Sequence, residues 1–376
     1  MVEIKNKRPS VAIVDHVGVK AGMECYDLEL YYGLKSLNCL PYIYSNFSSS
    51  EDGVNQVFTF RLKESIFSVM KMLKVFFEIG KALKRQEVNN IVFHGFRFGI
   101  IEWMFLKMLS GNDARIFLII HDVESLAVSS SGDAWMKRIF KLCSRLVVHN
   151  KFSFEELSSQ LDAREMKKLC IIPHGNFIRT AFHDSNKEAF MTRHHLPDEK
   201  KYVLFFGQIK KTKGLDLLLE AFALSGTSAQ LIIAGKMRKH SFLQYQELID
   251  GHHLKERVKL FIGYISPQMR SDLFQLAEVV VLPYTKIFQS GVLLMTMSAG
   301  KAVIASDLPP NKELIKDGEN GFLFESGNKL HLAKVIHDVV KDNDKRSRVA
   351  TAGLEYVRTQ LDWNGIANEW LKLFQS

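Results

Sequence analysis

The feature that most constrains the fold of this chain is a regular alternation of short apolar runs with amphipathic helical patterns. Each run has the length of one strand and is rich in β-branched and aromatic residues, as in strands that are buried on both faces. In the first half the runs are VAIVDH (11–16), PYIYS (41–45), IVFHGF (91–96), IFLIIHD (116–122), RLVVHN (145–150) and CIIPHG (170–175). Strands that alternate with helices predict a parallel, doubly wound α/β sheet.

The same rhythm starts again after a polar stretch around residues 181–200. The second set of runs is YVLFFG (202–207), QLIIAG (230–235), RVKLFIG (257–263), VVVLPY (279–284), AVIAS (302–306) and GFLF (321–324). A length of 376 residues is enough for two domains of ordinary size. We therefore expect two Rossmann-like domains, 1–185 and 186–376, that face a ligand cleft.

Cysteine usage and hydropathy restrict the compartment. The 4 cysteines form no CxxC pair and no regular ladder, so neither a metal cluster nor a disulfide framework is expected. The apolar run at the N-terminus is too short for a signal peptide, and no run of about 18 apolar residues predicts a membrane span. These features favour a reduced, cytoplasmic location and leave peripheral attachment to the inner face of the membrane open.

The formal net charge of +9 indicates an anionic partner. No basic tail or arm concentrates this charge, so nucleic acid is disfavoured. One helical segment, residues 61–86, carries six basic and two acidic residues between Lys63 and Arg85. Two interpretations remain open: a helix that packs on the sheet with a solvated polar face, or an interfacial helix that binds an anionic membrane surface.

A basic turn follows the first strand of the second half. In FFGQIKKTKG, Gly207 allows the backbone to turn, Lys210, Lys211 and Lys213 follow, and Gly214 opens the next helix. Cations beside a helix start, at the carboxyl end of a parallel strand, suit a diphosphate. A solvated loop is the alternative.

A second turn of this kind follows VVVLPY. Ser290 is a good N-cap for the apolar helix VLLMTMSA, and Gly291 lets a ligand approach the backbone N–H groups of Gly291 and Val292. The pattern predicts an anion site made by the backbone. A capped core helix without a ligand remains the alternative. Ser153 is predicted in the same way to cap the helix FSFEELSSQL.

These motifs and their order resemble the nucleotide-binding domain of GT-B glycosyltransferases, close to family 4. The resemblance is carried by FFGQIKKTKG, LIIAGK, AEVVVLPY, SGVLLMTMSAGKAVIASD and ELIKDGENGFLF, and it covers residues 200–376 strongly and 10–180 more loosely. The final LDWNGIANEWLKLF resembles the closing helix of the family, which crosses back to the first domain. The resemblance implies a GT-B fold and a nucleotide-sugar donor.

The resemblance also assigns donor-side roles. Lys213 matches the lysine that holds the donor diphosphate, and His121 matches the histidine that contacts the transferred sugar. Gln208 stands where many members have arginine, so Lys210 or Lys211 is expected to compensate. Glu313 matches a glutamate near the nucleotide.

On the acceptor side, Gly18 and Gly22 match the glycine-rich loop, and Asp15 and His16 end the strand before it. His94, like His121, is either functional or a packed structural histidine. The chain departs from the family at its paired glutamates, whose positions are occupied by Ile287 and Met295. Methionine cannot accept hydrogen bonds from ribose hydroxyls as a glutamate does.

We expect a glycosyltransferase that moves a sugar from a nucleotide-sugar to a lipid-linked or polysaccharide acceptor in envelope or exopolysaccharide assembly. The resemblance implies retention of configuration, and charge stabilisation by lysines and a helix tip requires no metal or other cofactor. If the enzyme inverts, a base such as Asp15, His16 or His121 is required. The alternatives are a degenerate GT-B protein that acts as a non-catalytic partner subunit and a GT-B nucleotide-sugar epimerase.

Overall fold

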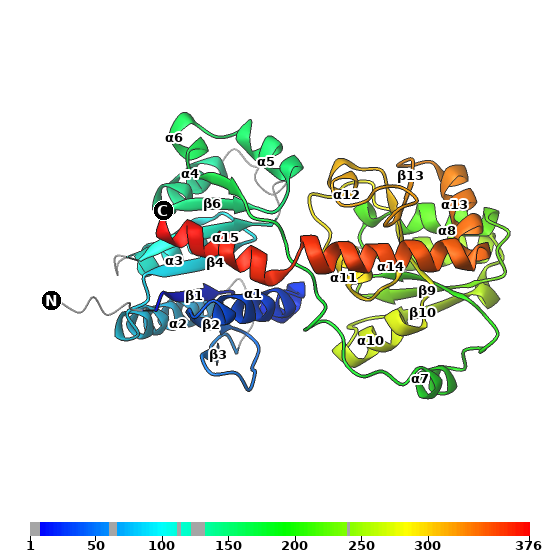
Figure 1. Ribbon diagram of the computed structural model, residues 1–376, viewed down its shortest axis with the longest axis horizontal. Coiled ribbons are helices and arrows are strands. Elements are labelled where there is room, and N and C mark those ends of the chain that lie inside the picture. Colours follow the sequence, from blue (N-terminus) through cyan, green and yellow to red (C-terminus); the bar gives the residue numbers. More distant parts are fainter. Residues whose placement is uncertain (1–7, 60–65, 111–113, 122–131, 239–240) are drawn as a thin grey trace. The chain divides into compact units, whose positions relative to one another are not determined.

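The structure is a computed structural model that describes residues 8–59, 66–110, 114–121, 132–238 and 241–376. It divides into two compact units (Figure 1): residues up to Gly175 together with 363–376, and residues 176–362. The division falls before the predicted boundary at residue 185. Asn176 explains the difference, because its side chain donates hydrogen bonds at 3.0 Å to the carbonyl oxygens of Val357 and Leu361 in the second unit.

The first unit is built on a parallel sheet of 7 strands in the order β3-β2-β1-β4-β5-β6-β7. Each apolar run of the first half forms one strand, and a short edge strand, β3, was not predicted. The strands are β1 (Ser10–Val14), β2 (Leu40–Ser45), β3 (Val54–Gln56), β4 (Asn90–Gly95), β5 (Arg115–Ile120), β6 (Arg145–Val148) and β7 (Leu169–Ile171).

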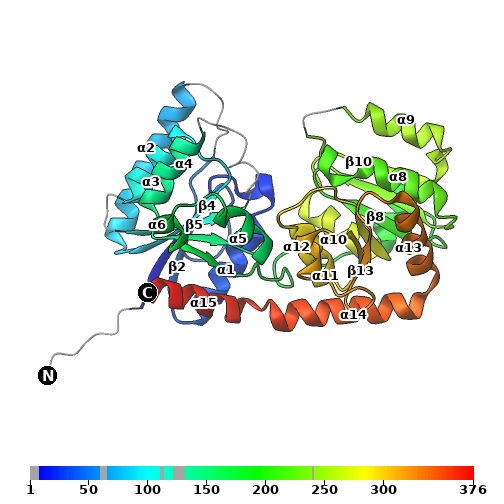
Figure 2. The same ribbon diagram turned by 90° about the horizontal axis from the view of Figure 1, so that it is seen from above.

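Helices cover both faces of this sheet. Figure 2 shows α2 (Ile66–Arg85), α3 (Ile100–Ser110) and α4 (Gly132–Leu142) together on one side, and α1 (Glu24–Ser36) with α15 (Trp363–Gln375) on the other. The remaining helices of the unit are short: η1 (Gly18–Ala21), α5 (Lys151–Ser158) and α6 (Ala163–Met166). Asn150 caps α5, not Ser153 as predicted, because the helix begins earlier than expected and Asn150 accepts the Ser153 N–H at 2.7 Å.

The last helix, α15, contributes to the core of the first unit although it comes from the other end of the chain. Trp370 is fully buried, and its ring lies beside Phe117 of the inner strand β5. Close packing of α15 on α1 requires a glycine at position 33, since a Cβ there would lie 2.7 Å from the Trp363 carbonyl oxygen. The first unit is therefore complete only with residues from both ends of the chain.

The second unit is built on a parallel sheet of 6 strands in the order β10-β9-β8-β11-β12-β13. All of its strands coincide with predicted runs: β8 (Tyr202–Phe206), β9 (Gln230–Gly235), β10 (Val258–Ile262), β11 (Val279–Leu282), β12 (Ala302–Ser306) and β13 (Phe322–Phe324). The two sheets with helices on their faces confirm the predicted doubly wound α/β fold.

The helices of the second unit connect its strands, except that α7 precedes β8 and that α13 and α14 follow β13. They are α7 (Lys187–His194), η3 (Lys211–Lys213), α8 (Leu215–Leu224), α9 (Leu243–Gly251), η4 (Lys255–Arg257), α10 (Pro267–Leu276), α11 (Gly291–Ser298), α12 (Pro309–Lys312), α13 (Lys329–Lys341) and α14 (Asn343–Gln360). The core of the unit lies between the sheet and these helices, with α8 and α13 packed side by side.

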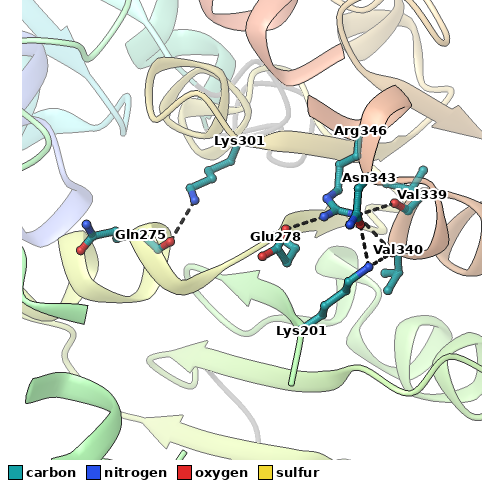
Figure 3. A network of polar contacts seen from close by, with 8 residues as sticks. All are labelled: Lys201, Gln275, Glu278, Lys301, Val339, Val340, Asn343 and Arg346. Atoms are coloured by element: carbon teal, nitrogen blue, oxygen red, sulfur yellow. Dashed lines mark hydrogen bonds and ion pairs between the residues drawn. The ribbon is translucent and has the colours of Figure 1, made fainter. Parts of the chain in front are cut away.

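A polar network holds the joint between α13 and α14 against the amino-terminal edge of this sheet (Figure 3). Arg346 donates hydrogen bonds to the carbonyl oxygens of Val339 and Val340 and pairs with Glu278, which precedes β11, at 2.6 Å. Lys201, which precedes β8, donates to the Val340 carbonyl at 2.8 Å and to Asn343 at 2.6 Å. These contacts lie at the edge opposite the carboxyl ends of the strands, where ligands of such sheets bind.

Helix α2 contains the part of the basic segment 61–86 that the structure describes; residues 61–65 lie outside it. One face of the helix is buried at positions spaced as a helix requires: Met72, Phe76, Ile79 and Leu83. Three large apolar residues of the helix are exposed: Phe67 (68%), Met70 (62%) and Phe77 (53%). None of the helices in the described ranges is long and apolar enough to cross a membrane.

Candidate functional site

The basic turn after β8 is held against the loop after β11 by the backbone. The Thr285 N–H donates to the Thr212 carbonyl oxygen at 3.0 Å. Gly214 ends η3 and starts α8 with φ of 62°, in the left-handed region, and a Cβ at this position would meet the Pro283 carbonyl oxygen. Glycine is therefore required twice over, by its backbone conformation and by this close approach.

Lys213 lies at the centre of the basic turn. Its Nζ sits over the ring of Tyr284, 3.5 Å from the centroid. Burial, followed by repulsion from Lys210, lowers the pKa of Lys213 to about 7. A lysine in this state gains a proton readily when an anion arrives, because the anion offsets the cost of holding a charge in a poorly solvated place.

Lys210 and Lys211 lie on the outer part of the turn. Lys210 is half-buried and its carbonyl oxygen accepts the Lys213 N–H at 2.8 Å, whereas Lys211 is exposed. Only Lys213 of the three predicted lysines therefore has the aromatic neighbour and the lowered pKa that mark an unusual environment.

The tip of α11 has the predicted geometry. The Ser290 Oγ accepts the Leu293 N–H at 3.2 Å, as an N-cap residue does. A Cβ at Gly291 would have its nearest neighbour, a Phe177 ring carbon, 4.0 Å away, so the backbone at the helix start is uncrowded. Val292 lies next to the glycine turn of β8, because a Cβ on Gly207 would approach its methyl group to 3.4 Å. The two turns that the sequence predicts as anion sites therefore lie next to each other.

The order of the strands explains why the two turns meet. β8 and β11 are neighbours in the sheet although β9 and β10 come between them in the sequence. The chain proceeds outward from β8 through β9 to β10 and then returns to β11, so the connections diverge between β8 and β11. Such a topological switch point is the usual ligand position in an open α/β sheet.

An arginine reaches the position where the family's phosphate-binding arginine is replaced by Gln208. The Arg238 guanidinium, from the loop after β9, donates to the Gln208 Oε1 at 2.9 Å. The Arg238 N–H donates to the Ile209 carbonyl at 3.0 Å and holds the two loops together. Sequence reasoning missed this residue, because only the pairing of β8 with β9 brings position 238 beside position 208.

Three further positions belong to the donor side by the family resemblance: Glu313, Met295 and Ile287. Glu313 is exposed at the end of α12 and faces Tyr356 of α14, whose pKa is raised by burial and then by this carboxylate. Met295, at one position of the missing glutamates, is buried inside α11. Ile287, at the other, is half-buried in the loop before the helix. Neither can replace a carboxylate as a hydrogen-bond acceptor.

The acceptor-side residues of the first unit separate into two groups. Asp15 is fully buried and accepts the N–H groups of Val17 at 2.8 Å and Gly18 at 2.9 Å; burial raises its pKa to about 6. Gly18 has φ of 45°, and Gly22 has φ of 73° with open space around it. His16, in contrast, packs its ring parallel to Phe93, 6.0 Å away, in an aromatic cluster.

His121 follows β5 and is half-buried. Its Nε2 lies 2.8 Å from the Nδ1 of His94, which sits near the end of the neighbouring strand β4. Burial, followed by the nearby histidines, holds the pKa of His121 well below its ordinary value, so the ring is neutral. Asp122, the next residue in the sequence, lies outside the described residues.

Comparison with known proteins supports a common family for the second unit. Residues 186–356 match the family model described as "Glycosyl transferases group 1". The phosphatidyl-myo-inositol mannosyltransferase of Mycobacterium leprae is 29% identical over 183 residues, 47% of this chain and 46% of that protein. The α-D-kanosaminyltransferase of Streptomyces kanamyceticus is 27% identical over 195 residues, 51% of this chain and 49% of that protein. The matched region thus spans about half the length of these curated relatives.

Solved structures extend the likeness of the fold to nearly the whole chain. A glycosyltransferase from Rickettsia africae matches with a TM-score of 0.72 and 17% identity, over 98% of each chain. Anabaena HepE, solved in complex with UDP-glucose, matches with a TM-score of 0.70 and 16% identity, over 97% of this chain and 99% of that one. The chain therefore has a GT-B fold, and its residues 186–356 form a domain of the glycosyl transferases group 1 family.

Proposed function

We propose that this protein is a glycosyltransferase that transfers a sugar from a nucleoside diphosphate sugar. The observation that carries the proposal is the joining of the Lys213 turn and the Gly291 helix tip at the switch point of the second sheet. A lysine, an adjacent arginine and open backbone N–H groups together suit a diphosphate. The name of Anabaena HepE in complex with UDP-glucose is a reason to try uridine donors first.

The proposed mechanism is electrostatic and independent of metal. Charge develops on the diphosphate as the bond to the sugar breaks, and Lys213 and the N–H groups at the start of α11 stabilise that charge. Arg238 takes the place of the arginine missing at position 208. With the leaving group stabilised in this way, we propose that the sugar is transferred with retention of configuration, as the family resemblance implies.

The proposed acceptor is a lipid-linked or polysaccharide saccharide. Two similar proteins have names that point this way: the phosphatidyl-myo-inositol mannosyltransferase of Mycobacterium leprae and the lipopolysaccharide 1,2-N-acetylglucosaminetransferase of Salmonella typhimurium. The second is 23% identical over 237 residues, 60% of this chain and 61% of that protein. An acceptor that lies in a membrane would also explain why one face of α2 exposes large apolar residues.

We propose that α2 binds an anionic membrane surface. Exposed aromatic rings and lysines alternate on its outer face: the Nζ of Lys71 lies 4.8 Å from the ring centre of Phe67, and that of Lys81 lies 4.4 Å from that of Phe77. Rings that enter the lipid and lysines that meet its phosphates are the two parts of an interfacial helix. We propose the cytoplasmic leaflet as the surface that α2 binds.

Co-sedimentation with vesicles of phosphatidylglycerol and phosphatidylcholine tests the membrane proposal. Binding should fall when four exposed lysines of the helix are replaced by glutamate: Lys71, Lys74, Lys81 and Lys84. The control carries the same change of charge on exposed lysines elsewhere: Lys255, Lys334, Lys341 and Lys372. An equal loss in both proteins would mean that net charge alone attracts the vesicles, and would contradict a role for α2.

Donor screening tests the proposed reaction. Thermal shift with a panel of nucleoside diphosphate sugars should show one base preferred, since a bound donor stabilises the fold by mass action. The preferred donor is then tested for turnover with lipid-linked saccharides. Lys213→Ala should lower kcat/KM at least about tenfold, because a charge-assisted contact contributes roughly 1.5–3 kcal/mol.

The second candidate is a GT-B protein without catalytic activity, and the buried Met295 in place of a ribose-binding glutamate favours it. Such a protein would bind no nucleoside diphosphate, or would bind one without turnover with any acceptor. Isothermal titration with UDP, GDP and ADP separates these outcomes. Absence of binding to all three would reject the transferase proposal.

A further inference from the structure

Four neighbouring strands of the first sheet end in histidines that surround one tyrosine. His94, His121, His149 and His174 stand at or after the carboxyl ends of β4, β5, β6 and β7. Their ring centres lie 5.3, 6.2, 5.5 and 4.8 Å from that of the fully buried Tyr26 on α1. The family resemblance implies a role toward the transferred sugar for His121, and the function of the other three rings is open.

Two of these histidines are fixed by the backbone. The Nδ1 of His149 lies 2.8 Å from the Ile172 carbonyl oxygen, and that of His174 lies 2.7 Å from the Gly175 carbonyl oxygen. A carbonyl oxygen only accepts, so both rings carry their proton on Nδ1. Because the backbone fixes both rings in this way, we assign His149 and His174 a structural role.

The other two histidines bind each other. The Nδ1 of His94 and the Nε2 of His121 are 2.8 Å apart, the planes of the rings differ by 9°, and the ring centres are 5.0 Å apart. The centre separation exceeds the N···N distance by about two ring radii, so the rings meet edge to edge in one plane. This is a well-formed hydrogen bond in which one ring donates and the other accepts.

The far side of His94 faces buried carboxyls. Its Nε2 lies 3.1 Å from the Asp27 Oδ1, at ion-pair distance but without hydrogen-bond alignment. Asp15 lies beside Asp27, and both are fully buried without a lysine or arginine partner in the part of the chain that the structure describes. Bonds of this kind are often poorly aligned in ligand-free enzymes and tighten when substrate binds.

Asp15 supplies the negative end of the cluster. Each of its carboxylate oxygens accepts one backbone N–H, an arrangement that favours the ionised form. Asp27, next to it, is held protonated by burial and by the charge of Glu24, which raise its pKa well above the ordinary value. The pair therefore shares one negative charge, and the nearest ring that can donate to it is His94.

We propose that Asp15, Asp27 and His94 hold His121 as the tautomer protonated on Nε2, so that its Nδ1 accepts a hydrogen bond from a substrate hydroxyl. His94 donates from Nε2 to the carboxyl pair, and its Nδ1 accepts the Nε2–H of His121. His94 and Asp27 are then positioning residues that act through His121. The role toward substrate rests on the proposed function, whereas the tautomer does not.

The groups around this hydrogen-bond chain keep the rings of His94 and His121 neutral. Burial lowers the pKa of both His94 and His121, and the groups that face them are Asp15, Asp27, Glu24, Tyr26, His149 and His174. Burial raises the pKa of Tyr26, so that side chain is uncharged as well. The two backbone N–H groups that Asp15 accepts hold its carboxylate in place at the end of the cluster.

A metal ion in the same place would have the opposite effect. Ligand atoms of Asp15, Asp27 and His94 lie within 4.8 Å of one another and could hold a divalent cation. The cation would take the lone pair of the His94 Nε2, so the Nδ1 of that ring would carry the proton and donate to His121. His121 would then be protonated on Nδ1. The tautomer of His121 therefore distinguishes the two arrangements.

Long-range ¹H–¹⁵N spectra of the full chain labelled with ¹⁵N-histidine, after treatment with EDTA, report the tautomers directly. We expect His121 to be protonated on Nε2, with a slowly exchanging low-field proton. His94→Gln should remove that signal, because the glutamine amide replaces Nε2 and leaves no partner at Nδ1. The matched control His149→Gln, from the same cluster, should keep it. Protonation of His121 on Nδ1, or a signal unchanged in His94→Gln, would overturn the proposal.

Activity provides an independent readout with the preferred donor. His94→Gln should lower kcat about tenfold with little change in donor KM, the effect of one lost hydrogen bond near the reacting atoms. Asp15→Asn should be slow as well, because it removes the negative charge at the end of the cluster. If His94→Gln does not fold, Asp27→Ala, which removes the acceptor that faces the His94 Nε2, serves in the same assays. If His121 has the expected tautomer but the protein shows no turnover, the proposed function is rejected and the hydrogen-bond chain is retained.

Discussion

At the scale of single residues, the environment of a side chain decides its chemistry more than its identity does. Lys210, Lys211 and Lys213 are equivalent in the sequence, yet only Lys213 lies against an aromatic ring and has a pKa of about 7. His94 and His149 both end strands, yet one bonds a ring and the other a carbonyl oxygen. Chemically similar residues therefore take different roles.

The lowered pKa of Lys213 predicts proton uptake when a diphosphate binds. At pH 8 the free side chain is mostly neutral, and a bound diphosphate restores its charge, so about one proton should be taken up per site. Isothermal titration of UDP in buffers of different ionisation enthalpy measures this number. In Lys213→Arg the uptake should vanish, because arginine is charged throughout. Equal uptake in both proteins would contradict the prediction.

Gly214 should tolerate substitution much less than another glycine with the same backbone conformation. Gly214 and Gly226 both have φ of 62°, but a Cβ at Gly214 would meet the Pro283 carbonyl whereas Gly226 has open space. Gly226→Ala should cost only the left-handed strain, roughly 1 kcal/mol. Gly214→Ala should cost more and weaken UDP binding. Equal stabilities in urea and equal UDP affinities would contradict a role for this close approach.

At the scale of helices and strands, the local sequence pattern determines where an element lies along the chain. Long-range contacts determine which of its faces is buried. The predicted strands of the second sheet coincide with β8 to β13, because continuous apolar runs between turns are a local signal. The cap of α5 was predicted wrongly, and which apolar residues of α2 are buried was left open by the sequence. A helical repeat shows that a stripe exists, but only the neighbouring sheet decides whether Phe76 or Phe77 turns inward.

The joint between α13 and α14 should depend on Arg346. This side chain is 6% exposed and satisfies two carbonyl oxygens at the end of α13 as well as Glu278. Arg346→Ala should lower the free energy of unfolding by about 2 kcal/mol, since buried acceptors lose their donors. Arg358→Ala, an exposed arginine of the same helix paired with Glu355, should change it little. Chemical denaturation compares the two.

At the scale of the whole molecule, the chain contains two cores, and one of them is completed by the last helix. Residues 363–376 pack in the first unit, so its folding requires contacts between segments that are far apart in the sequence. Each unit has its own hydrophobic core, which is the condition for unfolding as a separate cooperative element.

Calorimetry should therefore distinguish the units. Trp370→Ala should lower the transition of the first unit, because removal of a fully buried tryptophan costs about 3–5 kcal/mol. UDP should raise the transition of the second unit. Glu369→Ala, an exposed neighbour on α15, serves as the control. A shift of the UDP-sensitive transition in Trp370→Ala, with the other unchanged, would contradict this assignment.

The sequence by itself determined the alternation of strands and helices and the turns that contain Gly207, Gly214 and Gly291. These are local features, because apolar runs and glycine turns act within a few residues of chain. Tertiary structure alone decided that Tyr284 lies under Lys213, that Arg238 reaches Gln208, and that His94 joins Asp27 to His121. The reason is that parallel strands distant in sequence bring their carboxyl ends to one edge of the sheet.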